Sequence, residues 1–373
     1  MKKGLVVIYD PHSLHQFIWY KCTYGLEKRW DALCLPNDYM GMYMDTYCNR
    51  AGVFDQIFTG TINYIQLPMK EKAMLFAKMC FYYIIGKRRR CCKKILDEYV
   101  GDIDNYDELI AICDTGFVSG LFALLGKEKK VVYLDDGAGE YNKRSRWKNA
   151  YKISSGVYWQ SFFMACMGYG CKGRFYFGPT KWCYKYSAVT SEMKYTNYKE
   201  MLNLFDMSST DISLYEDLLN RIYPDIKKLD FESAEAIFFT DPMSGFWEDY
   251  QKYVDECIQY IGNRYKSIII KKHPKDTATY DFGSDVKVQI VDNEIPAELI
   301  LDRIKGKNIV FNCISSIIIF MRPYKYKFEI LYSNRMYEGS IRSSVSKMKY
   351  VPYEKVLNYC EKFAKGYYKI VNI

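Results

Sequence analysis

The histidine of a Lys-Lys-His-Pro turn is the residue of this sequence best suited to act on an anion. His273 follows Ile268–Ile270, three β-branched residues typical of a buried parallel strand, and Pro274 prevents a regular element from continuing. We therefore expect His273 at the carboxyl end of a strand, where open α/β sheets bind ligands. With Lys271 and Lys272 beside it, the imidazole suits a phosphate better than a metal. The alternative is a loop histidine that only caps local backbone.

Further polar groups follow predicted strands or open a predicted helix over residues 295–304. They are Asp135-Asp136-Gly137, Glu298 behind Pro296, and Ser315-Ser316. Each has a structural alternative. An Asp-Gly pair commonly forms a turn, a glutamate in a first helical turn is favoured by the helix dipole, and serines cap helices.

Two more positions are weaker candidates. Asp241, in Thr240-Asp241-Pro242, follows a predicted strand and could serve as a base, or it could form a helix cap or Asx turn. His12 and Ser13 follow the first predicted strand and are candidates for the side that receives a substrate, with ordinary loop residues as the alternative.

Strands alternate with helices in two series, which predicts parallel sheets with right-handed crossovers. The fold class is α/β, with two facing Rossmann-like domains and a central cleft. The predicted organisation is an amino-terminal domain over 1–190, a linker helix region over 191–230, a carboxyl-terminal nucleotide-sugar-binding domain over 231–350, and a terminal helix over 351–373 that packs back on the first domain.

The composition is that of a globular protein with free thiols. The chain has 373 residues, 49% of them hydrophobic, enough for two domains. Thirteen cysteines without a CxxC pair indicate a reducing compartment. The start, MKKGLVVIYD, is too short for a signal peptide. We expect a cytoplasmic protein, and the net charge of +9 favours acidic ligands or an anionic membrane surface, with nothing that supports nucleic acid.

Two apolar stretches bear on membranes and partners. Residues 74–85 are too few to span a bilayer, and four basic residues, 87–90, follow at once. This arrangement suits an interfacial helix on the inner face of the cell membrane, although the sequence favours a core helix with a solvated charged end. The segment 157–177 could form a membrane patch, a homodimer contact or a buried subdomain.

The order and spacing of the acidic pair with glycine, the His-Pro turn and the serine pair resemble the motifs of bacterial sialyltransferases. The resemblance is closest to glycosyltransferase family 52, the lipooligosaccharide sialyltransferase group, with the capsule polysialyltransferases next. It implies a GT-B fold, a CMP-sialic acid donor held mainly by the second domain, inversion at the anomeric carbon, and neither metal nor cofactor. The acceptor would be a glycan of a surface polysaccharide or lipooligosaccharide.

The resemblance also implies residue roles. Asp135 would be the base, with Asp241 as its rival, and His273 would donate to the leaving phosphate from the opposite wall of the cleft. Asp136 and Gly137 would hold the turn. The implied donor-binding residues are Lys272, Pro274, Glu298 on the ribose hydroxyls, Ser315 and Ser316.

Other functions stay open at this point. A transferase of another nucleotide sugar and a polyol-phosphate transferase of the teichoic-acid type both share the two-domain arrangement. A noncatalytic protein that binds a glycan or nucleotide is the alternative from a different class.

Overall fold

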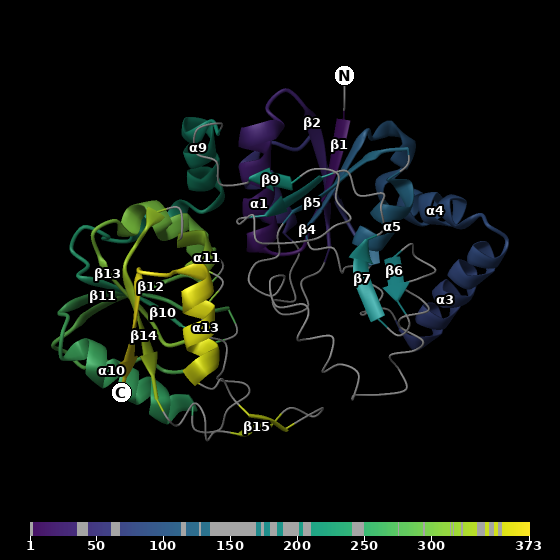
Figure 1. Cartoon of the computed structure of the whole chain (residues 1–373). Coiled ribbons are helices and arrows are strands. Elements are labelled where there is room, and N and C mark those ends of the chain that lie inside the picture. Colours follow the sequence, from purple (N-terminus) through teal and green to yellow (C-terminus); the bar gives the residue numbers. More distant parts are fainter. Residues whose placement is uncertain are drawn as a thin grey trace. The chain divides into compact units, whose positions relative to one another are not determined.

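The computed structural model divides the chain into two compact units, Met1–Ile222 and Tyr223–Ile373, and each is described by itself (Figure 1). The structure describes residues 3–35, 44–60, 68–112, 117–126, 128–134, 169–172, 175–179, 185–188, 201–203, 210–240, 250–274, 276–293, 295–313, 315, 317–321, 324–333, 340–342, 347–349 and 353–373.

The first unit is built on a parallel sheet with the strand order β3-β2-β1-β4-β5-β8-β9. Its strands are β1 Lys3–Ile8, β2 Arg29–Cys34, β3 Gln56–Thr59, β4 Glu108–Ile112, β5 Lys130–Leu134, β8 Lys185–Ala188 and β9 Met201–Asn203, and an antiparallel pair is formed by β6 Tyr169–Lys172 and β7 Phe175–Pro179. The helices are α1 Pro11–Tyr24, α2 Asp45–Ala51, α3 Met69–Ile84, α4 Arg88–Val100, η1 Ile103–Asn105, α5 Phe117–Leu125 and α9 Ile212–Ile222.

Buried carboxylates stabilise the amino edge of this sheet. Glu108, 1% exposed at the start of β4, accepts from Tyr20 Oη and Lys28 Nζ and lies 3.2 Å from Lys130 Nζ. Asp31 in β2 is fully buried and is bound by Tyr106 Oη at 2.6 Å. A buried charge is costly unless it is paired, so we assign these contacts a structural role. Ligands of open α/β sheets bind at the carboxyl edge instead.

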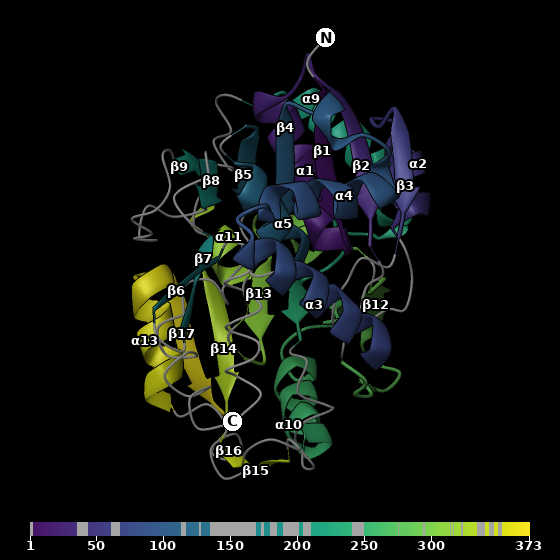
Figure 2. The ribbon, with the colours of Figure 1, turned by 90° about the vertical axis from the view of Figure 1, so that its right-hand side faces the viewer.

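The second unit has a parallel sheet with the order β12-β11-β10-β13-β14-β17, the doubly wound order of a Rossmann-like fold. Figure 2 shows β13, β14 and β17 side by side. The strands are β10 Ala236–Phe239, β11 Ser267–Lys271, β12 Lys287–Val291, β13 Asn308–Phe311, β14 Phe328–Tyr332 and β17 Tyr368–Asn372, with a hairpin of β15 Ser340–Arg342 and β16 Lys347–Lys349. The helices are η2 Pro224–Lys228, α10 Tyr250–Gly262, η4 Ala297–Ile304, α11 Ile317–Met321 and α13 Tyr353–Phe363.

The α/β class with two parallel Rossmann-like sheets is confirmed, and some boundaries differ from those predicted. The division falls between Ile222 and Tyr223, inside the predicted linker 191–230, at the point where α9 ends and Pro224 opens η2. The segment 351–373, predicted as a terminal helix, contains the helix α13 and also the strand β17, which pairs with β14 in the sheet of the second unit. The helix predicted over 295–304 is a 3-10 helix, η4. Among the described helices none combines the length and apolar character that a membrane crossing needs.

Candidate functional site

The candidate site lies at the carboxyl edge of the second sheet. Strand register places Phe239 of β10 level with Lys271 of β11 and with Phe311 of β13. The residues that follow these three strands therefore leave the sheet at the same edge. Between β10 and β13 the strand order reverses, and such a switch point is where doubly wound sheets bind nucleotides.

The His-Pro loop is fixed by hydrogen bonds to its backbone. The His273 N–H donates to Thr240 Oγ1 at 3.0 Å, and the Asp276 N–H donates to the His273 carbonyl at 2.8 Å. Thr240 Oγ1 in turn donates to Asp276 Oδ2 at 2.5 Å. The loop is thus tied to the end of the neighbouring strand, and the half-buried His273 side chain is held at the sheet edge.

Asp276 is the centre of this arrangement and is only 3% exposed. Besides the Thr240 hydroxyl, its carboxylate accepts from Tyr280 Oη at 2.5 Å and from the Ala278 N–H at 2.9 Å. Burial is the main cause that raises the pKa of Tyr280, so its hydroxyl stays a donor. The sequence analysis did not identify Thr240 or Asp276 as residues of the site. A signal for Asp276 was present, because an aspartate three residues after His273 is typical of a turn in which a carboxylate accepts from backbone amides.

The two lysines before His273 support the loop. Lys271 is 4% exposed, and its Nζ donates to the Lys272 carbonyl at 2.8 Å and the Asp292 carbonyl at 3.4 Å. Burial lowers the pKa of Lys271 to about 8, and the nearby Glu298 and Asp292 oppose the shift. Lys272 Nζ donates to the Ala278 carbonyl at 3.0 Å. Lys271 is thus buried with its Nζ bound to backbone carbonyls, whereas the donor-binding role of Lys272 remains a prediction.

The loop after β13 contributes Asn312 and Ser315. Asn312 is fully buried, and its Nδ2 donates to Tyr250 Oη at 2.8 Å while its N–H donates to the Phe239 carbonyl at 3.3 Å. The Ser315 carbonyl accepts from Tyr359 Oη at 3.2 Å, and its half-buried side chain precedes α11.

The other predicted donor-binding residues of the described chain are Pro274, after β11, and Glu298, after β12. Pro274 is exposed and follows His273 directly. Glu298 is half-buried in the first turn of η4, the segment that follows β12 and Asp292. Its charge acts on Lys271, the residue that supports the His-Pro loop.

Several predicted residues lie outside the described ranges: Asp135, Asp136, Gly137, Asp241 and Ser316. Asp241 is joined directly to Thr240 in the sequence. The structure therefore gives no placement for either candidate base.

In the first unit, His12 and Ser13 lie in the first turn of α1 instead of a loop. Ser13 is fully buried in a capping box: its N–H donates to Asp10 Oδ1 at 2.7 Å, and its Oγ accepts from the Asp10 N–H at 2.9 Å. Capping accounts for Ser13. His12 is half-buried, with Nε2 3.5 Å from Gln16 Nε2, and its role on the acceptor side remains a prediction.

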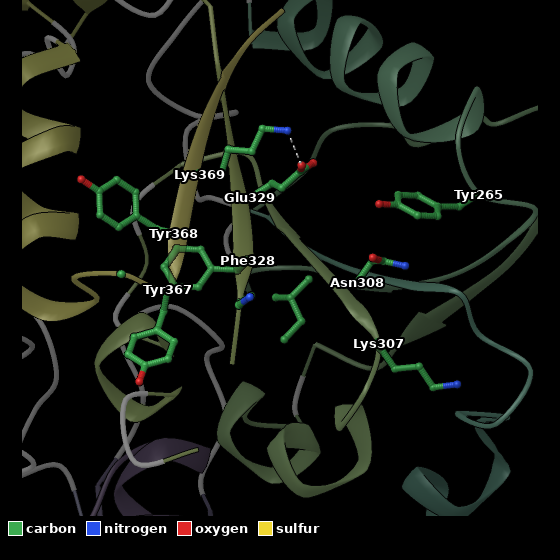
Figure 3. Close-up of a pocket in the computed structure, with 11 residues that line it drawn as sticks. Tyr265, Lys307, Asn308, Phe328, Glu329, Tyr367, Tyr368 and Lys369 are labelled. Atoms are coloured by element: carbon green, nitrogen blue, oxygen red, sulfur yellow. Dashed lines mark hydrogen bonds and ion pairs between the residues drawn. The ribbon is translucent and has the colours of Figure 1, made fainter. Parts of the chain in front are cut away.

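A pocket of about 450 Å³ lies at the opposite edge of the second sheet, at the starts of β13, β14 and β17. Figure 3 shows Lys369 reaching toward Glu329, with Nζ and Oε1 3.1 Å apart, and the Tyr265 ring on the far side. Tyr260 Oη also donates to Glu329, at 2.8 Å. None of the residues that the sequence singles out lines this pocket, so the His-Pro edge remains the candidate site.

Comparisons with solved structures returned, among others, a rhamnosyltransferase and UDP-GlcNAc 2-epimerases at low identity. A spinosyn rhamnosyltransferase is 11% identical with a TM-score of 0.44, over 89% of this chain and 80% of that one. The UDP-GlcNAc 2-epimerase of Methanocaldococcus jannaschii is 12% identical with a TM-score of 0.47, over 100% and 89%. The UDP-GlcNAc 2-epimerase of Neisseria meningitidis is 11% identical with a TM-score of 0.47, over 88% and 82%. A comparison with curated proteins gave no match.

The model of Glycosyltransferase family 52 matches residues 119–332, a span that contains the acidic pair, the His-Pro loop, Glu298 and the serine pair. Together with the two parallel α/β units, this match defines the class: the protein is a glycosyltransferase of the GT-B type. Since the match covers more than half of the chain, the protein belongs to glycosyltransferase family 52.

Proposed function

We propose that this glycosyltransferase is a sialyltransferase, which moves sialic acid from CMP-sialic acid to a glycan hydroxyl with inversion and without a metal or cofactor. The observation that carries the proposal is His273 at the carboxyl edge of the second sheet, in a loop whose backbone is bound to Thr240 and Asp276. The order of the acidic pair, the His-Pro turn and the serine pair within the family match supports the choice of donor.

The leaving group sets what the second unit must do. As the bond to the anomeric carbon breaks, charge accumulates on the CMP phosphate, and a fixed donor lowers the barrier most when it needs no reorganisation. His273 would donate to that phosphate, with the Ser315 and Ser316 hydroxyls as further donors. Lys272 and Pro274 would shape the loop around the phosphate, since Lys272 Nζ already binds the Ala278 carbonyl.

The remaining roles concern the ribose and the acceptor. Glu298 would accept from the ribose hydroxyls, because a carboxylate can accept from two donors at once. Asp135 would take the proton of the acceptor hydroxyl, with Asp136 and Gly137 holding its turn. Asp241 competes for the same role, and separate substitutions decide between them. His12 is a candidate contact for the acceptor.

The experiment that tests the function is a nucleotide screen followed by product analysis. Saturating CMP should raise the melting temperature, because a ligand at a hundredfold excess over its Kd stabilises the folded state by about 2.7 kcal/mol. Stabilisation by UDP or CDP alone would favour another sugar donor or a polyol-phosphate transferase. Binding of CMP-sialic acid without transfer or hydrolysis would favour a noncatalytic protein.

The proposed setting is the synthesis of a surface polysaccharide or lipooligosaccharide in the cytoplasm. Incubation with desialylated surface glycans of either type, with analysis of the product linkage, would identify the acceptor. Inversion is read from the anomeric configuration of that product.

A further inference from the structure

Helix α3 exposes large apolar side chains along one face. Met74 is 64% exposed, Phe81 58% and Ile84 78%, and Ile85 just after the helix is 43% exposed. Positions 74, 81 and 84 are seven and three residues apart, a spacing that places them on one helix face. Within the described part of the chain, this apolar face of α3 is therefore exposed.

The opposite face of α3 is packed. Met79 is fully buried, and Leu75, Phe76, Cys80 and Tyr82 pack against the hydrophobic core of the first unit. The orientation of the helix is therefore fixed by its packed side, and the apolar residues of the other side are held outward. The sequence favoured a core helix, whereas these exposed fractions favour a helix that lies at an interface.

Basic residues border the exposed face. Gly86, with a φ of 71°, turns the chain out of α3, and Lys87 and Arg90 beside the turn are exposed. Arg89 Nη1 lies 3.2 Å from Glu128 Oε1, and this ion pair makes Arg89 less available to an external anion. Figure 1 shows α3 and α4 joined at this turn. The result is an apolar face with a positively charged border, which we call the α3 surface: Met74, Phe81, Ile84, Ile85, Lys87 and Arg90.

We propose that the α3 surface binds an anionic phospholipid membrane. An amphipathic helix with a basic border lies in the headgroup region, where its apolar side chains enter the acyl boundary and its cations meet lipid phosphates. The positive charge argues against a second copy of the chain as the occupant. A copy carries the same basic border and the same net charge of +9, so the two surfaces repel one another.

Vesicle sedimentation tests this proposal without donor or acceptor, so its outcome is independent of the catalytic one. The full chain should sediment with vesicles of phosphatidylcholine and phosphatidylglycerol in equal parts and not with phosphatidylcholine alone. Raising the salt from 0.1 M to 1 M, which shortens the Debye length from about 10 to about 3 Å, should release most of it. Each charge that docks on the surface contributes about fivefold to binding.

Variants assign the binding to the α3 surface. Phe81→Gln with Ile84→Gln, and Lys87→Glu with Arg90→Glu, should each weaken binding at least about tenfold. Leu26→Gln, Ile290→Gln and Lys305→Glu change exposed residues elsewhere and should bind as the unmodified chain does. Melting temperatures identify any variant that is unfolded. Three results would each overturn the proposal. The first is binding that survives in both folded α3 variants, and the second is absence of binding of the unmodified chain to anionic vesicles. The third is self-association in lipid-free solution that the double substitution Phe81→Gln, Ile84→Gln abolishes.

Discussion

The backbone N–H of His273 donates to Thr240 Oγ1 at 3.0 Å, which joins the loop after β11 to the first residue after β10. The position of the histidine is therefore set within the second unit, by a side chain from a neighbouring strand. The backbone contacts of this loop fix the position from which the His273 side chain can act.

Removal of the Asp276 carboxylate should destabilise the second unit. Asp276→Ala leaves the Thr240 hydroxyl, the Tyr280 hydroxyl and the Ala278 N–H without their acceptor in a buried place. We expect a loss of about 3 kcal/mol in the free energy of unfolding, measured by urea denaturation. Asp285→Ala, at an exposed position, is the matched control and should change it by less than about 0.5 kcal/mol. Equal effects of the two substitutions would contradict the structural role of Asp276.

The His273 side chain should matter for catalysis and little for folding. His273→Ala removes the imidazole but leaves the backbone bonds to Thr240 and Asp276 in place. We expect kcat to fall by a factor on the order of 10² to 10⁴, the range for a general acid or an oxyanion donor, with an unchanged melting temperature. His273→Gln keeps a neutral donor and should recover part of the loss. Near-normal turnover in folded His273→Ala would show that the motif match is accidental.

Lys271 should make stability depend on alkaline pH. Burial lowers its pKa from 10.5 to about 8, so between these values the unfolded chain binds a proton that the folded chain has lost. Stability attributable to Lys271 therefore rises with pH across this window, by at most about 3 kcal/mol. The difference in unfolding free energy between the unmodified chain and Lys271→Met, followed from pH 8 to 10.5, isolates the effect from other titrating groups. Parallel curves for the two proteins would mean that Lys271 keeps an ordinary pKa.

The base is tested with Asp135→Asn and Asp241→Asn. We expect Asp135→Asn to abolish transfer and to keep CMP binding, because the base acts on the acceptor hydroxyl and not on the nucleotide. Asp241→Asn should retain transfer. If the folded Asp241→Asn protein is inactive while Asp135→Asn transfers normally, the base belongs to the second unit.

The main elements of the fold could be read from the sequence, because buried parallel strands such as Ile268–Ile270 are continuous apolar runs bounded by polar turns. The edge strand β17 was missed. Tyr368–Asn372 mixes a lysine and polar residues with isoleucine and valine, and only its pairing with β14 identifies it as part of the sheet. Such long-range pairing is not encoded in the local pattern.

The candidate site was predicted in part. His273 at a strand end could be recognised from its Pro and the apolar run before it. The supporting role of Lys271 could not be recognised, because the alternation of side chains along a strand does not show how deeply the last side chain is buried. Thr240 and Asp276 lie 36 residues apart in the sequence, and only the adjacency of β10 and β11 brings them together. Ser13 was taken for a candidate contact because a capping serine and a binding serine have the same residue type.

The most direct test of the account is CMP release from CMP-sialic acid in the presence of a desialylated surface glycan and excess EDTA, with UDP-sugars as competing donors. We predict CMP release coupled to a sialylated product, unaffected by EDTA and lost in His273→Ala. Transfer from a UDP-sugar but not from CMP-sialic acid would contradict the proposed donor. Activity that EDTA abolishes and magnesium or manganese restores would contradict metal independence and would point to a metal-binding role for Asp135 and Asp136.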